Sequence, residues 1–155
     1  MQDSATDVVD AILRASRVLV AVAARSLSAV DHDVTLPQFR ALVVLAQRGP
    51  QRPSTLADAL GVHPSTITRL CDRLVAKRLV KRAESPGNRR EVTITLTPKG
   101  KRLVDSVTAT RRVEIAEIVT RVPQRERATM VRALNALGEA AGEPADANWF
   151  TGWGE

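Results

Sequence analysis

Basic side chains gather in the middle of the chain, where their number suits contact with a polyanion. Eight of them lie between Val62 and Glu91, namely Arg69, Arg73, Lys77, Arg78, Lys81, Arg82, Arg89 and Arg90. Only Asp72, Glu84 and Glu91 oppose them, so this window carries +5 of the formal +6 of the whole chain. Clustered cations attract the phosphates of nucleic acid. We therefore expect a nucleic-acid-binding segment here.

The residues before and within this window predict two short helices joined by a tight turn. Ser54 is a suitable N-cap for a helix over residues 55–60, and Gly61 can adopt the left-handed conformation that ends it. A second helix is expected to start at His63-Pro64, because proline fits the first turn of a helix, and to end near Lys77. Two helices in this arrangement are typical of a helix-turn-helix.

A β-hairpin is expected to follow the second helix. Residues 79–83 form a short apolar strand, and residues 91–96 alternate polar and apolar side chains. Residues 85–88, with the sequence SPGN, predict the turn between them. The hairpin completes a winged helix-turn-helix over residues 35–98.

Long amphipathic helices are expected on both sides of this domain. Apolar residues recur at helical spacing over residues 7–30 and 97–122, and a last helix is expected to start at Pro123. Their stripes are too wide for one small domain to cover, so we assign residues 1–34 and 99–141 to a homodimerisation region. The expected fold is mainly α with a small β-hairpin wing.

Composition excludes several other classes of protein. A chain of 155 residues with one cysteine and two histidines has no internal disulfide and too few ligands for a predicted metal site. No catalytic motif or cofactor-binding loop is present, so we expect neither an enzyme nor a cofactor. Its longest apolar run, residues 18–24, is too short to span a membrane, which favours a cytoplasmic protein. The aperiodic tail over residues 142–155, which holds both tryptophans, is expected to be flexible or docked on the helices.

Five short segments give the chain a resemblance to a known family. They are LPQFRAL (36–42), LADALGVHPSTITRLCDRL (56–74), LVKR (79–82), NRR (88–90) and LTPKG (96–100). In their order and spacing the chain resembles the MarR family of bacterial transcriptional regulators. The resemblance implies a homodimeric repressor that binds double-stranded DNA at a pseudo-palindromic operator, with a small-molecule or redox signal releasing it.

The resemblance also implies which side chains contact DNA. From the second helix of the motif these are Pro64, Ser65, Thr66, Thr68 and Arg69. Arginine can donate two hydrogen bonds to a guanine edge, and a threonine methyl can touch a thymine methyl. Arg73 stays open between a phosphate contact and an ion pair, because it follows Asp72.

At the wing, the resemblance places Arg89 and Arg90 against the minor groove or its phosphates. The family usually has acids where this chain has Ser85 and Asn88. Because such acids anchor a wing arginine, the tip is expected to be more cationic here and less firmly held.

An effector site is also part of the resemblance. The resemblance implies a small aromatic or phenolic effector at the junction of the winged domain and the dimerisation helices, with Thr68 and Arg82 as candidate contacts. Arg82 could instead face phosphate. Cys71 could act as a redox sensor, but its spacing with Ile67 and Leu74 favours a buried packing thiol.

Two other functions remain as alternatives. One is a non-specific, nucleoid-like DNA-binding protein, which steep salt dependence without sequence preference would identify. The other is a winged helix that binds proteins, and the +5 charge of the central window argues against it. The sequence names neither the operator nor the effector, and it does not separate repressor from activator.

Overall fold

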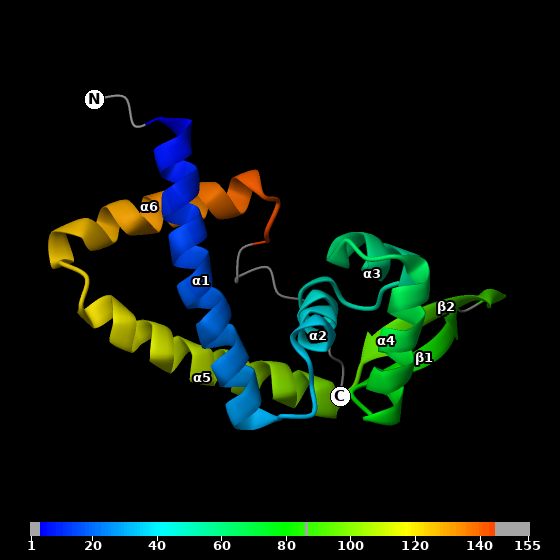
Figure 1. The fold of residues 1–155 in the computed structure, drawn as a ribbon. Helices are drawn as coiled ribbons and strands as arrows, with labels where there is room; N and C mark the ends of the chain where they lie inside the picture. Colours follow the sequence, from blue (N-terminus) through cyan, green and yellow to red (C-terminus); the bar gives the residue numbers. More distant parts are fainter. Residues whose placement is uncertain (1–3, 86, 145–155) are drawn as a thin grey trace.

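The computed structural model describes residues 4–85 and 87–144, and its fold is mainly helical with one β-hairpin (Figure 1). The elements are α1 (Ala5–Val30), α2 (Leu36–Arg48), α3 (Pro53–Leu60), α4 (Pro64–Ala76), β1 (Val80–Ser85), β2 (Asn88–Leu96), α5 (Pro98–Thr120) and α6 (Gln124–Ala140). The predicted fold class is confirmed. Residues 145–155, which include both tryptophans of the expected tail, lie outside the described residues.

Side-chain caps fix where three of the helices begin. Ser4 and Asp7 form a reciprocal capping box at the start of α1, and Thr35 and Gln38 form another at α2. At α5 the Thr97 hydroxyl accepts a hydrogen bond from the N–H of Gly100 at 3.1 Å. These bonds satisfy N–H groups that a helix leaves without internal partners.

The expected N-cap of α3 was wrong. The helix begins at Pro53, its N-cap is Arg52, and Ser54 lies within the first turn. Proline already has the backbone φ of a helix and lacks the N–H that this position would leave unpaired. These two properties move the start of the helix one residue ahead of the expected cap.

One hydrophobic core joins the helix-turn-helix, the wing and the first half of α5. Leu42, Leu45, Leu56, Leu74 and Ile94 have no exposed surface. The strands of the wing pair antiparallel, and Gln51, just before α3, forms an isolated bridge with Ile94. The wing is therefore attached to the body of the domain along its second strand.

The corner between α4 and β1 has an unusual residue at its left-handed position. The N–H of Leu79 bonds to the Leu74 carbonyl at 3.0 Å and that of Arg78 to the Val75 carbonyl at 2.9 Å, which is a Schellman motif. Arg78 has φ of 60°, and no other non-glycine residue in the described part of the chain has a positive φ. A left-handed conformation costs an L-residue other than glycine about 1–2 kcal/mol.

Helices α1, α5 and α6 extend to one side of the winged domain (Figure 1). Arg25 of α1 forms an ion pair with Glu114 of α5, and α6 has no buried residue. Much of the exposed apolar surface lies on these helices, at Val8, Val9, Ile12, Leu13, Val18, Leu19, Val20, Val30, Val113, Val131, Leu134 and Leu137. None of the helices in the described ranges combines the length and apolarity that crossing a membrane requires.

A substitution at Gly100 tests how closely α5 approaches the α4–β1 corner. A Cβ at Gly100 would lie 2.2 Å from the Leu79 carbonyl oxygen and 2.7 Å from Leu96 Cδ1. Gly100→Ala should lower the free energy of unfolding by about 1–3 kcal/mol, because overpacking displaces backbone. Gly138 of α6 has open space around it, so Gly138→Ala should raise that energy by up to about 1 kcal/mol. Urea titration measures both, and a fully stable Gly100→Ala protein would contradict the close approach.

Candidate nucleic-acid interface

Helix α4 has one buried face and one exposed polar face. The side chains of Ile67, Leu70, Cys71 and Leu74 are buried in the core. All of the predicted DNA-contacting residues of this helix are exposed, namely Pro64, Ser65, Thr66, Thr68, Arg69 and Arg73. The exposed face therefore presents hydroxyl groups, methyl groups and two guanidinium groups to solvent.

Hydrogen bonds near the start of α4 restrict what these side chains can do. His63 caps the helix, because its Nδ1 accepts from the N–H of Ser65 at 3.2 Å, and the Ser65 hydroxyl lies 2.8 Å from the same nitrogen. The Thr68 hydroxyl donates to the Pro64 carbonyl at 3.1 Å. Its proton is therefore already engaged, which leaves the methyl group of Thr68 as the better contact for a base.

A groove runs between α4 and the start of α2. Its volume is about 290 Å³, and it is lined by Thr35, Pro37, Gln38, Thr66, Arg69, Leu70 and Arg73. Arg69 and Arg73 therefore flank the N-terminal end of α2. A helix N-terminus carries partial positive charge, so both features of this groove favour a negatively charged group.

Arg73 and Arg82 have different surroundings in the structure. Asp72 of α4 pairs with Arg82 of β1, and this ion pair joins α4 to the wing. Among the described residues, no salt bridge involves Arg73. Because the Asp72–Arg82 pair is partly exposed, its contribution to stability is small, and its main effect is to orient β1 relative to α4.

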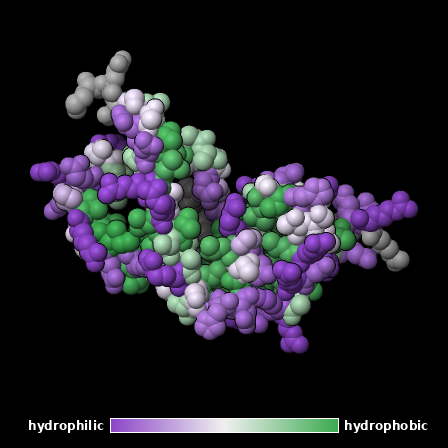
Figure 2. Space-filling view, viewed as in Figure 1, coloured by the Kyte–Doolittle hydropathy of each residue, from purple (hydrophilic) through white to green (hydrophobic). Residues whose placement is uncertain are grey.

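The wing projects beyond the domain, and hydrophilic side chains cover its end (Figure 2). Gly87 has φ of 87°, and the Asn88 side chain accepts a hydrogen bond from the N–H of Arg90 at 3.1 Å. This bond is to the main chain of Arg90, so the expected lack of an acidic anchor for a wing arginine stays a prediction. Arg90 is exposed, whereas the side chain of Arg89 lies outside the described residues. Glu91 pairs with Arg52 at 3.0 Å, which ties the tip-proximal part of β2 to the residue that caps α3.

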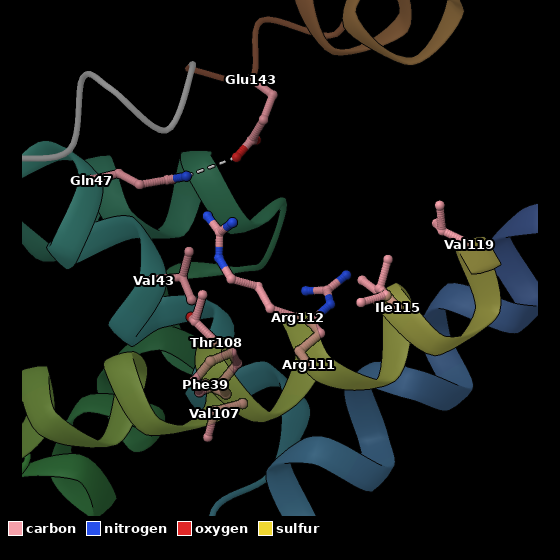
Figure 3. Close-up of a pocket in the computed structure, with 11 residues that line it drawn as sticks. Phe39, Val43, Gln47, Val107, Thr108, Arg111, Arg112, Ile115, Val119 and Glu143 are labelled. Carbon is pink, nitrogen blue, oxygen red and sulfur yellow. Dashed lines mark hydrogen bonds between the residues drawn. The ribbon is translucent and has the colours of Figure 1, made fainter. Parts of the chain in front are cut away.

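A separate cleft lies between α2 and α5, at the junction of the winged domain and the long helices. It has a volume of about 660 Å³ and is lined by Phe39, Val43, Gln47, Val107, Thr108, Arg111, Arg112, Ile115, Ala116, Val119 and Glu143. Figure 3 shows Gln47 and Glu143 joined across the rim, with an Nε2 to Oε1 distance of 2.8 Å. The Nε atom of Arg111 is buried and has no hydrogen-bond partner among the described residues.

The candidate effector contacts named from the sequence do not line this cleft. Thr68 lies on the exposed face of α4, and Arg82 pairs with Asp72. Sequence reasoning missed Phe39, Arg111 and Glu143. The adjacent arginines 111 and 112 were the available signal in the sequence. Glu143 had no such signal, because only the fold brings it to the cleft.

The thiol of Cys71 lies in the core beneath the exposed face. Burial raises the pKa of the Cys71 thiol, the positive charge of Arg82 acts against this rise, and the negative charge of Asp72 adds to it. A buried thiol with a raised pKa is a poor nucleophile. The expected packing role is therefore favoured. The described residues contain no group of three His, Cys, Asp or Glu side chains that could hold a metal ion.

Comparison with known proteins agrees with this geometry. The model of the MarR family matches residues 34–92. The transcriptional repressor NicR of Pseudomonas putida is 37% identical over 79 residues, which cover 51% of this chain and 50% of the repressor. The chain therefore spans about half the length of this curated relative.

Solved structures extend the likeness to the long helices. The crystal structure of RV1404 from Mycobacterium tuberculosis has a TM-score of 0.86 and 48% identity, and covers 93% of this chain and 99% of its own. BpsR of Bordetella bronchiseptica has a TM-score of 0.64 and 25% identity over 84% of this chain and 98% of its own. The DNA binding of BpsR is regulated by 6-hydroxynicotinic acid.

The reactivity of Cys71 tests whether it is a packing residue. At pH 8 the native protein should react with iodoacetamide at least about tenfold more slowly than the urea-denatured protein, because only the thiolate reacts and burial disfavours it. Because the folded protein favours the neutral thiol, Cys71 should contribute fully to the free energy of unfolding at neutral pH. This contribution should be lost as the pH rises above the ordinary thiol pKa of 9.0. Cys71→Ala should remove this pH dependence. Equal reaction rates for native and denatured protein would restore the sensor interpretation.

Proposed function

The chain belongs to the MarR family of transcriptional regulators, and we propose that it is a homodimeric repressor that binds a pseudo-palindromic operator and is released by a small ligand. Members of the family regulate transcription and are not enzymes. The observation that carries the proposal is the exposed face of α4, which presents Thr66, Thr68 and Arg69 beside a wing that carries Arg90. We place the protein in the cytoplasm, where it meets DNA.

Each exposed group has a role in this proposal. Arg69 reads a base edge in the major groove, because its guanidinium has two parallel donors. The wing arginines Arg89 and Arg90 bind phosphates or the minor groove and supply affinity without sequence preference. Arg73 borders the groove beside α2, and we assign it to a phosphate contact, since its neighbour Asp72 is engaged by Arg82.

Dimerisation through α1, α5 and α6 explains the apolar surface of these helices. Val131, Leu134 and Leu137 are 57%, 49% and 42% exposed, and α1 has a similar row. In a twofold dimer, a second copy of the chain would cover both rows with its own copies of the same helices. A twofold axis would also place two α4 helices about one turn of DNA apart, which accounts for a pseudo-palindromic site.

The cleft between α2 and α5 is the proposed effector site. Apolar side chains such as Phe39 and Val43 suit an aromatic ring, and the buried Nε of Arg111 is a donor for an acidic or phenolic oxygen. The ligand-regulated DNA binding stated for BpsR supports an effector of this class. Thr68 and Arg82 lie outside the cleft, and their contact with an effector stays a prediction.

Arg69→Ala tests sequence reading. With a duplex that the wild-type protein selects from a random pool, this change should weaken binding by about 1–3 kcal/mol and relax the preference at one base per half-site. The double change Arg89→Ala with Arg90→Ala should instead weaken binding to all duplexes and reduce the salt slope by roughly 0.9 per lost phosphate contact.

Fluorescence anisotropy at several salt concentrations separates these two effects. A wild-type protein that shows a steep salt slope but no preference for the selected duplex would support the nucleoid-like alternative. A wild-type protein without any DNA affinity at low salt would support the protein-interaction alternative.

Leu134→Glu with Leu137→Glu tests the dimer. Two charges on the apolar row of α6 should prevent association, because a charge buried without a partner is strongly unfavourable. Light scattering after gel filtration should give the monomer mass. Arg132→Glu, on the same helix, is the matched control and should remain a dimer. A dimer that survives the leucine substitutions would contradict this interface.

A further inference from the structure

Arg78 combines a disfavoured backbone with an exposed cation that has no structural partner. Its φ of 60° lies in the region that favours glycine. The side chain is exposed, and within the described residues its guanidinium makes no hydrogen bond or ion pair. Glycine would close the same Schellman motif without the steric cost. A strained residue whose side chain contributes nothing to the fold points to a role outside it.

The position of Arg78 continues the proposed DNA-binding face. Arg69 and Arg73 of α4 and Lys77, its C-cap, follow one another at intervals of four residues, so they lie along neighbouring turns of one helix surface. Arg78 comes directly after Lys77, where the helix ends. A ridge of positive charge thus runs from the base-reading residues to the α4–β1 corner.

The start of α5 adds another cation to the same corner. The Thr97 hydroxyl donates to the Arg78 carbonyl at 2.7 Å, and Lys99 Nζ donates to the Lys77 carbonyl at 3.1 Å. Lys77 Nζ donates to the main-chain carbonyl of Asp33. These carbonyl groups orient the two ammonium groups without neutralising them. Lys77, Arg78 and Lys99 therefore form a corner patch that makes no salt bridge with any carboxylate among the described residues.

We propose that this corner patch contacts the DNA backbone beside each half-site, and that Arg78 makes a phosphate contact there. The inference rests on the proposed function, and it adds a contact surface beyond the recognition helix and the wing. The partner we assign is phosphate, because a cation can bind phosphate without the defined donor geometry that a base contact requires. The strained backbone of Arg78 is the local cost of placing a guanidinium at the corner.

Three substitutions of Arg78 separate charge from backbone strain. Arg78→Asn removes the charge, and asparagine tolerates the left-handed region better than most residues do. Arg78→Lys keeps the charge. Arg78→Gly removes both the charge and the strain. Thermal melting reports on the fold, and anisotropy titration reports on DNA binding.

The expected results differ in sign between the two measurements. Arg78→Gly should raise the melting temperature and yet weaken binding to a long duplex selected by the wild-type protein. Arg78→Asn should weaken binding about as much and reduce the salt slope by roughly 0.9 for each of the two corners of a dimer. Arg78→Lys should keep the slope of the wild type.

The controls distinguish a failure of this inference from a failure of the proposed function. A wild-type protein that does not prefer its selected duplex over a random one would overturn the proposed function, and this inference with it. Normal wild-type preference with unchanged affinity and slope in Arg78→Asn would overturn only the corner contact. A loss of affinity that leaves the salt slope unchanged would also overturn the phosphate contact.

Discussion

The close packing of the first turn of α5 against the α4–β1 corner is the contact on which the rest of the structure depends. There Gly100 leaves no room for a Cβ beside the Leu79 carbonyl, and Thr97 caps α5 while its hydroxyl bonds to Arg78. The recognition helix, the wing and the helix that leads away to α6 all meet at this point. A displacement of the first turn of α5 would therefore move the exposed face of α4 and the wing relative to the long helices.

The charged residues of the central window divide into those that build the domain and those left for a partner. Asp72 is occupied by Arg82, and Glu91 is occupied by Arg52 from outside the window. Two of the three acids of the window are thus engaged in holding the wing to α4 and α3. The arginines of the exposed helix face retain their charge, so the ion pairs orient the interface without cancelling its attraction for phosphate.

Local sequence signals predicted the elements well, whereas contacts between distant residues could not be read from them. Pro64 and Gly61 fix their turns through backbone geometry that each residue carries with it, so the limits of α4 were predictable. The start of α3 was missed because Ser54 and Pro53 both suit a helix start, and proline prevails at its first position. The contact between Gln47 and Glu143 joins residues 96 positions apart, which no periodicity reveals.

The cleft between α2 and α5 connects this architecture to the proposed regulation. Its walls belong to the winged domain on one side and to the long helices on the other, and Glu143 closes its rim through Gln47 of α2. The opposite end of α2 borders the groove that Arg69 and Arg73 also line. Because α2 borders both the cleft and the groove, a ligand that changed its packing on α5 would also shift its N-terminus beside α4. In the proposed function, this single helix would couple ligand binding in the cleft to the proposed DNA-binding face.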